Sequence, residues 1–231
     1  MRKKLLSLAL AVVMCLSLAP VALAAEGVAG FNDVPQGVWY WDDLEYALYN
    51  GYISGTSSDT FSPNAPFSRG MCVTILGRMV GAATTGGSSR FEDVSPESWY
   101  GPYVAWAADK GYVNGVSKTE FKPDQTITFQ EMAVILDNYI KKSGVSLSGY
   151  TPSEEYTDAA TVSTWAKSSV EAVRGYGLLP TVDGAVRPRA SVSRAEATVA
   201  LVRLAKAAGL GHAPVEQPKP PNYRGDSQVR A

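Results

Sequence analysis

The chain of 231 residues has a single histidine, His212, and only two cysteines. A multi-histidine metal site is therefore excluded, and serine–histidine or cysteine–histidine catalysis would depend on that one imidazole. Positive charge is not in excess either, since 21 Lys and Arg face 22 Asp and Glu. A nucleic-acid-binding surface needs surplus basic residues, so we expect no nucleic acid partner. We predict neither a bound cofactor nor a metal.

Long apolar runs are also scarce, and the one present lies at the start of the chain. Three positive charges in residues 2–4 precede an uncharged apolar run over residues 5–19, and small residues at 22 and 24 follow it. This order is typical of a secretory signal peptide, residues 1–24, whereas a membrane anchor would need a longer span. Cleavage would leave 18 basic and 22 acidic residues, a net charge of −4 and no transmembrane segment in the mature chain.

What the chain has instead is a threefold internal repeat. The segment Phe31-Asn32-Asp33-Val34 recurs as Phe91-Glu92-Asp93-Val94 and, more loosely, as Tyr156-Thr157-Asp158-Ala159. The same landmarks follow each motif in the same order: a tryptophan (Trp39, Trp99, Trp165), a glycine (Gly51, Gly111, Gly177) and a proline (Pro63, Pro123, Pro188). We therefore divide the chain into repeat 1 (31–82), repeat 2 (91–144) and repeat 3 (156–210). Residues 211–231, which are rich in proline, are predicted to be a disordered tail.

Each repeat predicts two helices joined by a loop, so the expected fold is mainly α. In the second helix of each repeat, four equivalent apolar positions fall on one face. They are Cys72, Ile75, Leu76 and Met79; Met132, Ile135, Leu136 and Tyr139; and Ala197, Ala200, Leu201 and Leu204. One helix cannot bury such a stripe alone, so we expect the three second helices to meet around a common axis. Cys72 then fills the core rather than acting as a nucleophile.

The second helices also carry start signals. Thr128 with Glu131, and Ser193 with Glu196, match capping boxes, in which hydroxyl and carboxylate satisfy each other's backbone N–H groups. In repeat 1, Ser68 keeps the cap but no glutamate follows it. The structural role of the cap accounts fully for these serine, threonine and glutamate residues.

Capping does not explain Arg69 and Arg194, because a cation at the first helical position opposes the helix dipole. Each needs a partner. One alternative is a carboxylate of a neighbouring repeat, such as Asp33, Asp93 or Asp158. The other is an anionic ligand, which a guanidinium and the amides of a helix start would hold. The residues alone leave both open.

The repeated tryptophans pose a similar choice. Trp39, Trp99 and Trp165 could seat the first helix of each repeat, and a half-exposed indole could also stack on a sugar ring. Trp41 and Trp106 are not repeated and are poorer candidates.

Together these motifs resemble S-layer homology domains in triplicate: Phe-x-Asp-Val, then Trp, Gly-Tyr-Ile/Val-x-Gly, Phe-x-Pro-Asn/Asp and a Thr/Ser-Arg-Ala-Glu-like helix start. The resemblance covers about residues 31–210. It implies a pseudo-threefold, spindle-like fold around a central three-helix bundle. It also implies non-covalent anchoring to the bacterial cell wall through a pyruvylated secondary cell wall polysaccharide, bound in grooves between adjacent repeats. We therefore expect a secreted, non-enzymatic protein at the cell wall or S-layer.

The resemblance also predicts which residues line the grooves. Carried over by position, the ligand-binding residues are Asp33, Trp39, Arg69, Asp93, Trp99, Asp158, Trp165 and Arg194. This chain departs from the pattern in repeat 2, where Phe129 replaces the arginine. We therefore expect the groove at Phe129 to bind an anionic saccharide weakly or not at all, unless Arg187 or Arg189 compensates.

Two other functions are weighed. The chain could be an envelope adhesin or protein-interaction scaffold that uses the tail, which contains Arg224-Gly225-Asp226; a three-residue match of this kind is readily a chance one. It could also be a wall-attached glycoside hydrolase, for which the adjacent Glu154 and Glu155 would be candidates. Two adjacent acidic residues in a loop more often form a solvated surface, so this interpretation is the weaker one.

Overall fold

The computed structural model describes residues 27–82, 84, 88–147, 149, 151 and 156–212. The predicted signal peptide, most of the predicted tail and the pair Glu154 and Glu155 lie outside these residues. Within them the chain forms six α-helices: α1 (Trp41–Tyr49), α2 (Arg69–Met79), α3 (Gly101–Asp109), α4 (Phe129–Ser143), α5 (Lys167–Gly175) and α6 (Arg194–Ala207). Three short 3-10 helices, η1 (Gly27–Gly30), η2 (Ala159–Thr161) and η3 (Thr164–Ala166), complete the helical elements there. The expectation of a mainly α fold with two helices per repeat is confirmed.

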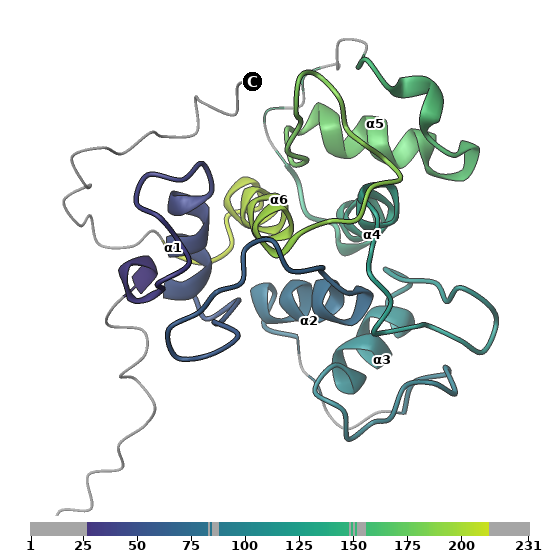
Figure 1. Ribbon diagram of the computed structural model, residues 1–231. Coiled ribbons are helices and arrows are strands. Elements are labelled where there is room, and N and C mark those ends of the chain that lie inside the picture. The colour runs from purple at the N-terminus through teal and green to yellow at the C-terminus, as the bar shows by residue number, and fades with distance from the viewer. Residues whose placement is uncertain are drawn as a thin grey trace, which may run out of the picture.

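The inner helices α2, α4 and α6 lie toward the centre, and α1, α3 and α5 lie outside them (Figure 1). Each outer helix packs on the inner helix of a different repeat: α1 on α6, α3 on α2, and α5 on α4. The most extensive packing of each outer helix is thus with a different repeat, and each repeat completes its neighbour. All twelve positions of the predicted apolar stripes are buried. Cys72 is among them, and its burial raises the pKa of the thiol to about 12, so it is a core residue.

A ring of main-chain hydrogen bonds joins the segments that lead into the inner helices. Phe67 N–H donates to the Val192 carbonyl (2.9 Å), Val192 to Ile127 (3.0 Å), and Ile127 back to Phe67 (2.9 Å). Because all three side chains are buried, these bonds lie away from water and fix the register of the repeats. A closed ring is what a pseudo-threefold axis requires; the spindle symmetry itself stays a prediction.

The helix ends follow the sequence signals. The side chains of Ser68, Thr128 and Ser193 cap α2, α4 and α6, and the two predicted capping boxes are formed. Gly51, Gly111 and Gly177 adopt φ values of 68°, 69° and 67°, the left-handed conformation that ends a helix.

The end of repeat 3 returns to repeat 1. Asn50 donates from Nδ2 to the carbonyl of His212 and accepts from His212 N–H, at 2.9 and 2.8 Å. The hydroxyl of Tyr46 donates to the Leu210 carbonyl. His212, the second residue of the predicted tail, therefore contacts the residue that directly follows α1. None of the helices that the structure describes is both long and apolar enough to cross a bilayer.

Candidate functional site at the repeat junctions

The three repeated aspartates hold the loop of their own repeat. Asp33 accepts hydrogen bonds from the main-chain N–H groups of Phe61 (2.8 Å) and Ser62 (2.6 Å). The other two repeats show the same pattern: Asp93 accepts from Phe121 and Lys122, and Asp158 from Val186 and Arg187. Ser62, Lys122 and Arg187 have φ values of 59°, 55° and 55°, a conformation that costs energy for a residue with a side chain. The charge-assisted hydrogen bonds offset that cost and fix the turn.

The two helix-start arginines reach the loop of the next repeat. Arg69 donates from Nε to the Phe121 carbonyl (2.9 Å) and from Nη2 to the Asn114 carbonyl (3.2 Å). Its guanidinium lies 4.6 Å from the centre of the Phe121 ring. Only 6% of Arg69 is exposed. The hydrogen-bond acceptors are thus main-chain carbonyls, which neither of the alternatives weighed from the sequence had named.

Arg194 makes the equivalent contacts between repeat 3 and repeat 1. It donates to the carbonyls of Phe61 (2.9 Å) and Ser54 (2.8 Å), and its guanidinium lies 4.7 Å from the Phe61 ring centre. We call the Arg69–Phe121 contact the 1/2 junction and the Arg194–Phe61 contact the 3/1 junction. Both arginines tie one repeat to another.

Carboxylates of the neighbouring repeats act on these arginines through charge. Burial lowers the pKa of Arg69, and the negative charges of Glu131 and Asp93 oppose that shift. Burial likewise lowers the pKa of Arg194, opposed by Asp33. The guanidinium groups remain protonated at any physiological pH. Asp33 thus acts on Arg194, and Asp93 on Arg69, through charge, while the hydrogen bonds of both guanidinium groups go to main-chain carbonyls.

In the third contact, which we call the 2/3 junction, the arginine and the phenylalanine have exchanged places: the phenylalanine is on the helix and the arginine is on the loop. Phe129, at the start of α4, takes the helix position of the arginine. Arg187 from the loop of repeat 3 lies over its ring, with the guanidinium carbon 4.9 Å from the ring centre. Arg187 also forms an ion pair with Glu196 through Nη2. This junction therefore keeps the arginine–aromatic pair, with the two partners exchanged between helix and loop.

The tryptophans differ in exposure. Trp99 and Trp165 are 53% and 59% exposed, whereas Trp39 is only partly exposed and packs against the core. Trp99 meets Tyr100 edge to face, with ring centres 5.0 Å apart. Exposed indoles of this size in repeats 2 and 3 offer flat apolar faces to a ligand such as a sugar ring.

Sequence reasoning did not find every residue of the junctions. It named the aspartates as one of two alternative partners for the arginines and missed the rings of Phe61 and Phe121 that the guanidinium groups cover. The signal was available, because both phenylalanines occupy the same repeated position before Pro63 and Pro123. The carbonyl acceptors could not be found this way, since any residue supplies one.

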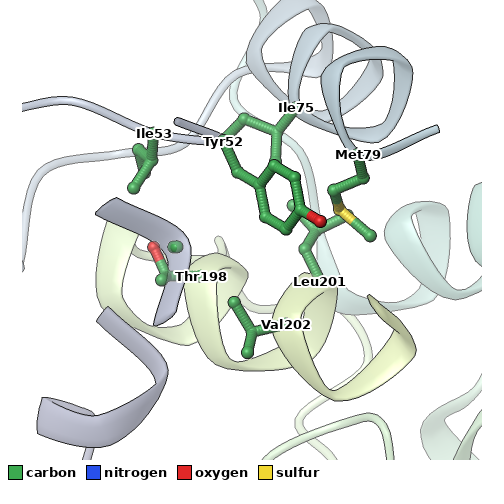
Figure 2. A pocket seen from close by; sticks show the side chains of 8 residues that line it. Tyr52, Ile53, Ile75, Met79, Thr198, Leu201 and Val202 are labelled. Atoms are coloured by element: carbon green, nitrogen blue, oxygen red, sulfur yellow. The ribbon is translucent and has the colours of Figure 1, made fainter. Parts of the chain in front are cut away.

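A small apolar cavity lies elsewhere, where α1, α2 and α6 meet. Its volume is about 10 Å³, room for roughly one water molecule. Figure 2 shows side chains around it, and the lining residues are Ala47, Tyr52, Ile53, Ile75, Met79, Thr198, Leu201 and Val202. No sequence-predicted site residue lines it, and it is too small for a sugar.

Comparison with known proteins identifies the family to which the three repeats belong. A family model for the S-layer homology domain matches residues 30–70, 90–133 and 155–198. Each matched segment begins one residue before a predicted repeat. The triplicate resemblance indicated by the motifs is thereby confirmed.

Several relatives share sequence along most of the chain. The Surface-layer 125 kDa protein of Lysinibacillus sphaericus is 31% identical over 179 residues, which cover 77% of this chain and 14% of that protein. An endoglucanase of Bacillus sp. (strain KSM-635) is 27% identical over 199 residues, covering 83% and 21%. The cellulosome-anchoring protein of Acetivibrio thermocellus is 25% identical over 156 residues, covering 65% and 34%. The chain thus spans only a minor part of the length of each of these relatives.

Proposed function

Because the chain belongs to the S-layer homology family of cell-surface proteins, we propose that it anchors non-covalently to the bacterial cell wall. The proposed ligand is a secondary cell wall polysaccharide, bound at the junctions between repeats. The single observation that carries this proposal is the exposure of Trp99 and Trp165. They are large aromatic side chains left open to solvent at equivalent positions of two repeats, where a sugar ring can stack.

The predicted groove residues divide into two roles under this proposal. Asp33, Asp93 and Asp158 shape the loop turns, and Arg69 and Arg194 hold neighbouring repeats together. The tryptophans, with Trp39 the least exposed, contact the sugar. Binding at more than one junction of the same chain would add avidity along a polymer, so each contact can be weak.

We further propose that the polymer is acidic and that a pyruvyl ketal supplies its carboxylate. The mature chain is mildly acidic by composition, so bulk charge would not attract such a polymer. Recognition then depends on placed guanidinium groups at the junctions, which bind carboxylates with directional hydrogen bonds.

The chain itself is proposed to be a binding module rather than an enzyme. The matched region is 21% of the endoglucanase, as expected of a part that can accompany a catalytic domain. A scaffold that recruits a protein through residues 213–231 is the second candidate, with no described residue in its favour.

Sedimentation with purified cell walls tests the proposal. The variant Trp99→Ala/Trp165→Ala should bind intact walls on the order of tenfold more weakly or worse, since truncating an aromatic residue that anchors a ligand typically costs about 2 kcal/mol. Tyr49→Ala is the matched control, because Tyr49 is 52% exposed but is not a repeated landmark. Equal binding of the double variant and the wild type would refute the proposed site.

The acidic group is tested separately. Walls from which pyruvyl groups have been removed should retain less wild-type protein than untreated walls. Unchanged retention would remove pyruvate from the proposal while leaving wall anchoring in place.

A further inference from the structure

The three junctions differ in how far their arginine is open to solvent. Arg69 and Arg194 are 6% and 7% exposed, and each already donates to two main-chain carbonyls. The side chain of Arg187, at the 2/3 junction, is 35% exposed. Of the three arginines that stack on junction phenylalanines, Arg187 therefore has the side chain most open to solvent.

Arg187 also retains unused hydrogen-bonding capacity. Its Nη2 donates to Oε1 of Glu196, and its Nε is buried without a hydrogen-bond partner among the described residues. A guanidinium carries five N–H donors in a planar fork that matches a carboxylate or a phosphate. The Phe129 ring supports this fork, with the guanidinium carbon 4.9 Å from the ring centre.

An exposed indole belongs to the same part of the fold. Gln130, next to Phe129 at the start of α4, accepts a hydrogen bond at Oε1 from the main-chain N–H of Ser163 (3.0 Å). Trp165 follows Ser163 by two residues and is 59% exposed. The 2/3 junction thus has an exposed cation and, close in the chain to its α4 contact, an exposed aromatic face.

We propose that Arg187 is the anion-recognising residue of this chain and that the 2/3 junction binds an acidic group, carboxylate or phosphate, carried on a saccharide. This inference rests on the proposed wall-binding function and specifies its charged contact. The sequence predicts weak or absent anion binding at Phe129 unless Arg187 or Arg189 compensates, and the proposal is that Arg187 compensates. The arginine has moved from the helix to the loop, where it is more exposed than its two counterparts.

Glu196 gives the proposal a second, opposite prediction. Its Oε2 accepts from the N–H and hydroxyl of Ser193, while Oε1 holds Arg187. A ligand anion therefore shares the guanidinium with a resident carboxylate. Neutralising Glu196 should strengthen binding of an anion at Arg187, whereas a purely structural Arg187–Glu196 pair predicts no gain. Glutamine can keep the capping box, so the helix start is preserved.

The experiment measures the affinity of the mature three-repeat chain for purified secondary cell wall polysaccharide by calorimetry. Arg187→Ser introduces the residue that repeat 1 has at the same positive φ, at Ser62, and should weaken binding on the order of tenfold. Arg187→Lys introduces the residue that repeat 2 has there, at Lys122, and should retain part of the affinity. Glu196→Gln should strengthen binding severalfold. Glu131→Gln, the equivalent change in the capping box of α4, should not.

Chemical treatment of the polymer identifies the acidic group. Carboxyl-reduced polymer and dephosphorylated polymer are each compared with the untreated one. The treatment that removes the difference between wild type and Arg187→Ser names the group as carboxylate or phosphate. If the affinities of the wild type and Arg187→Ser still differ after both treatments, the proposal is overturned, because Arg187 would then not bind an anionic group.

The remaining outcomes separate this inference from the function on which it rests. Thermal unfolding of each variant establishes that it is folded at the temperature of the binding measurement. If the wild type binds walls but Arg187→Ser binds equally well, or Glu196→Gln brings no gain, the assignment of Arg187 is wrong and wall anchoring stands. If the wild type does not bind walls, both fail.

Discussion

Asp33 and Arg194 hold the same residue from opposite sides. Asp33 accepts the main-chain N–H of Phe61, and Arg194 donates to the carbonyl of that same residue. Because Asp33 belongs to repeat 1 and Arg194 to repeat 3, this arrangement ties the last repeat to the first. Asp93 and Arg69 meet in the same way at Phe121, between repeats 1 and 2. The landmark residues are therefore parts of one repeated structural unit.

Removing a junction arginine should destabilise the fold. Arg69→Ala leaves the carbonyls of Phe121 and Asn114 without their donor and uncovers the Phe121 ring. We expect the free energy of unfolding to fall by about 2–3 kcal/mol, as for other lost buried hydrogen bonds to a charged group. Urea denaturation measures the difference.

Arg203→Ala is the control for that change. Arg203 donates to the Gly177 carbonyl at 3.2 Å, in a hydrogen bond that is open to solvent. Its loss should cost less than about 1 kcal/mol. Equal losses for the two variants would show that burial of Arg69 contributes nothing particular.

Much of the fold could be predicted from the sequence because its signals are local. The apolar stripes of α2, α4 and α6 and the capping boxes at Thr128 and Ser193 each depend on residues within a few positions of one another. The threefold repeat strengthened each of these predictions, since the same helix pattern occurs three times in the sequence.

The junctions could be predicted only in part, because their contacts join different repeats. Sequence spacing suggested that Arg69 needs a partner, but main-chain carbonyls carry no sequence signature. At the 2/3 junction, the sequence named Arg187 and Arg189 as residues that could compensate for Phe129 but could not choose between them. The structure shows that Arg187 stacks on the Phe129 ring.

Thr74 offers a stabilising substitution. Its hydroxyl is buried in α2 and has no hydrogen-bond partner among the described residues. Val134 and Val199 occupy the same position in α4 and α6. Thr74→Val should therefore raise the free energy of unfolding by about 1 kcal/mol, because it removes an unsatisfied polar group without changing the shape much.

Thr198→Val serves as the matched comparison. The hydroxyl of Thr198 is also buried but donates to the Arg194 carbonyl at 2.7 Å. We expect no gain, or a small loss, from that change. Urea denaturation in which both valine variants gained equally would show that the hydrogen bond, or its absence, does not decide the outcome.

Glu196 should make stability depend on acidity. Burial raises the pKa of Glu196, but hydrogen bonds from Arg187 and Ser193 outweigh it, and the pKa lies below the ordinary value of 4.5. A carboxyl group whose pKa is lower in the folded state than in the unfolded state stabilises the fold fully at pH values above the unfolded-state pKa. That contribution is lost as the pH falls through the folded pKa.

Thermal unfolding between pH 7 and pH 3 measures this contribution. The melting temperature of the wild type should fall more steeply below about pH 4.5 than that of Glu196→Gln, which has no group to protonate there. Glu92→Gln is the control, because the side chain of Glu92 is exposed on the surface. It should leave the wild-type slope nearly unchanged. Parallel curves for the wild type and Glu196→Gln would contradict the prediction.

The most direct measurement is sedimentation of the mature chain with cell walls before and after extraction of the secondary cell wall polysaccharide. We predict that the protein pellets with intact walls, stays in solution with extracted walls, and is released from intact walls by the free polysaccharide. Undiminished binding to extracted walls would contradict the account, because the ligand would then not be the polymer.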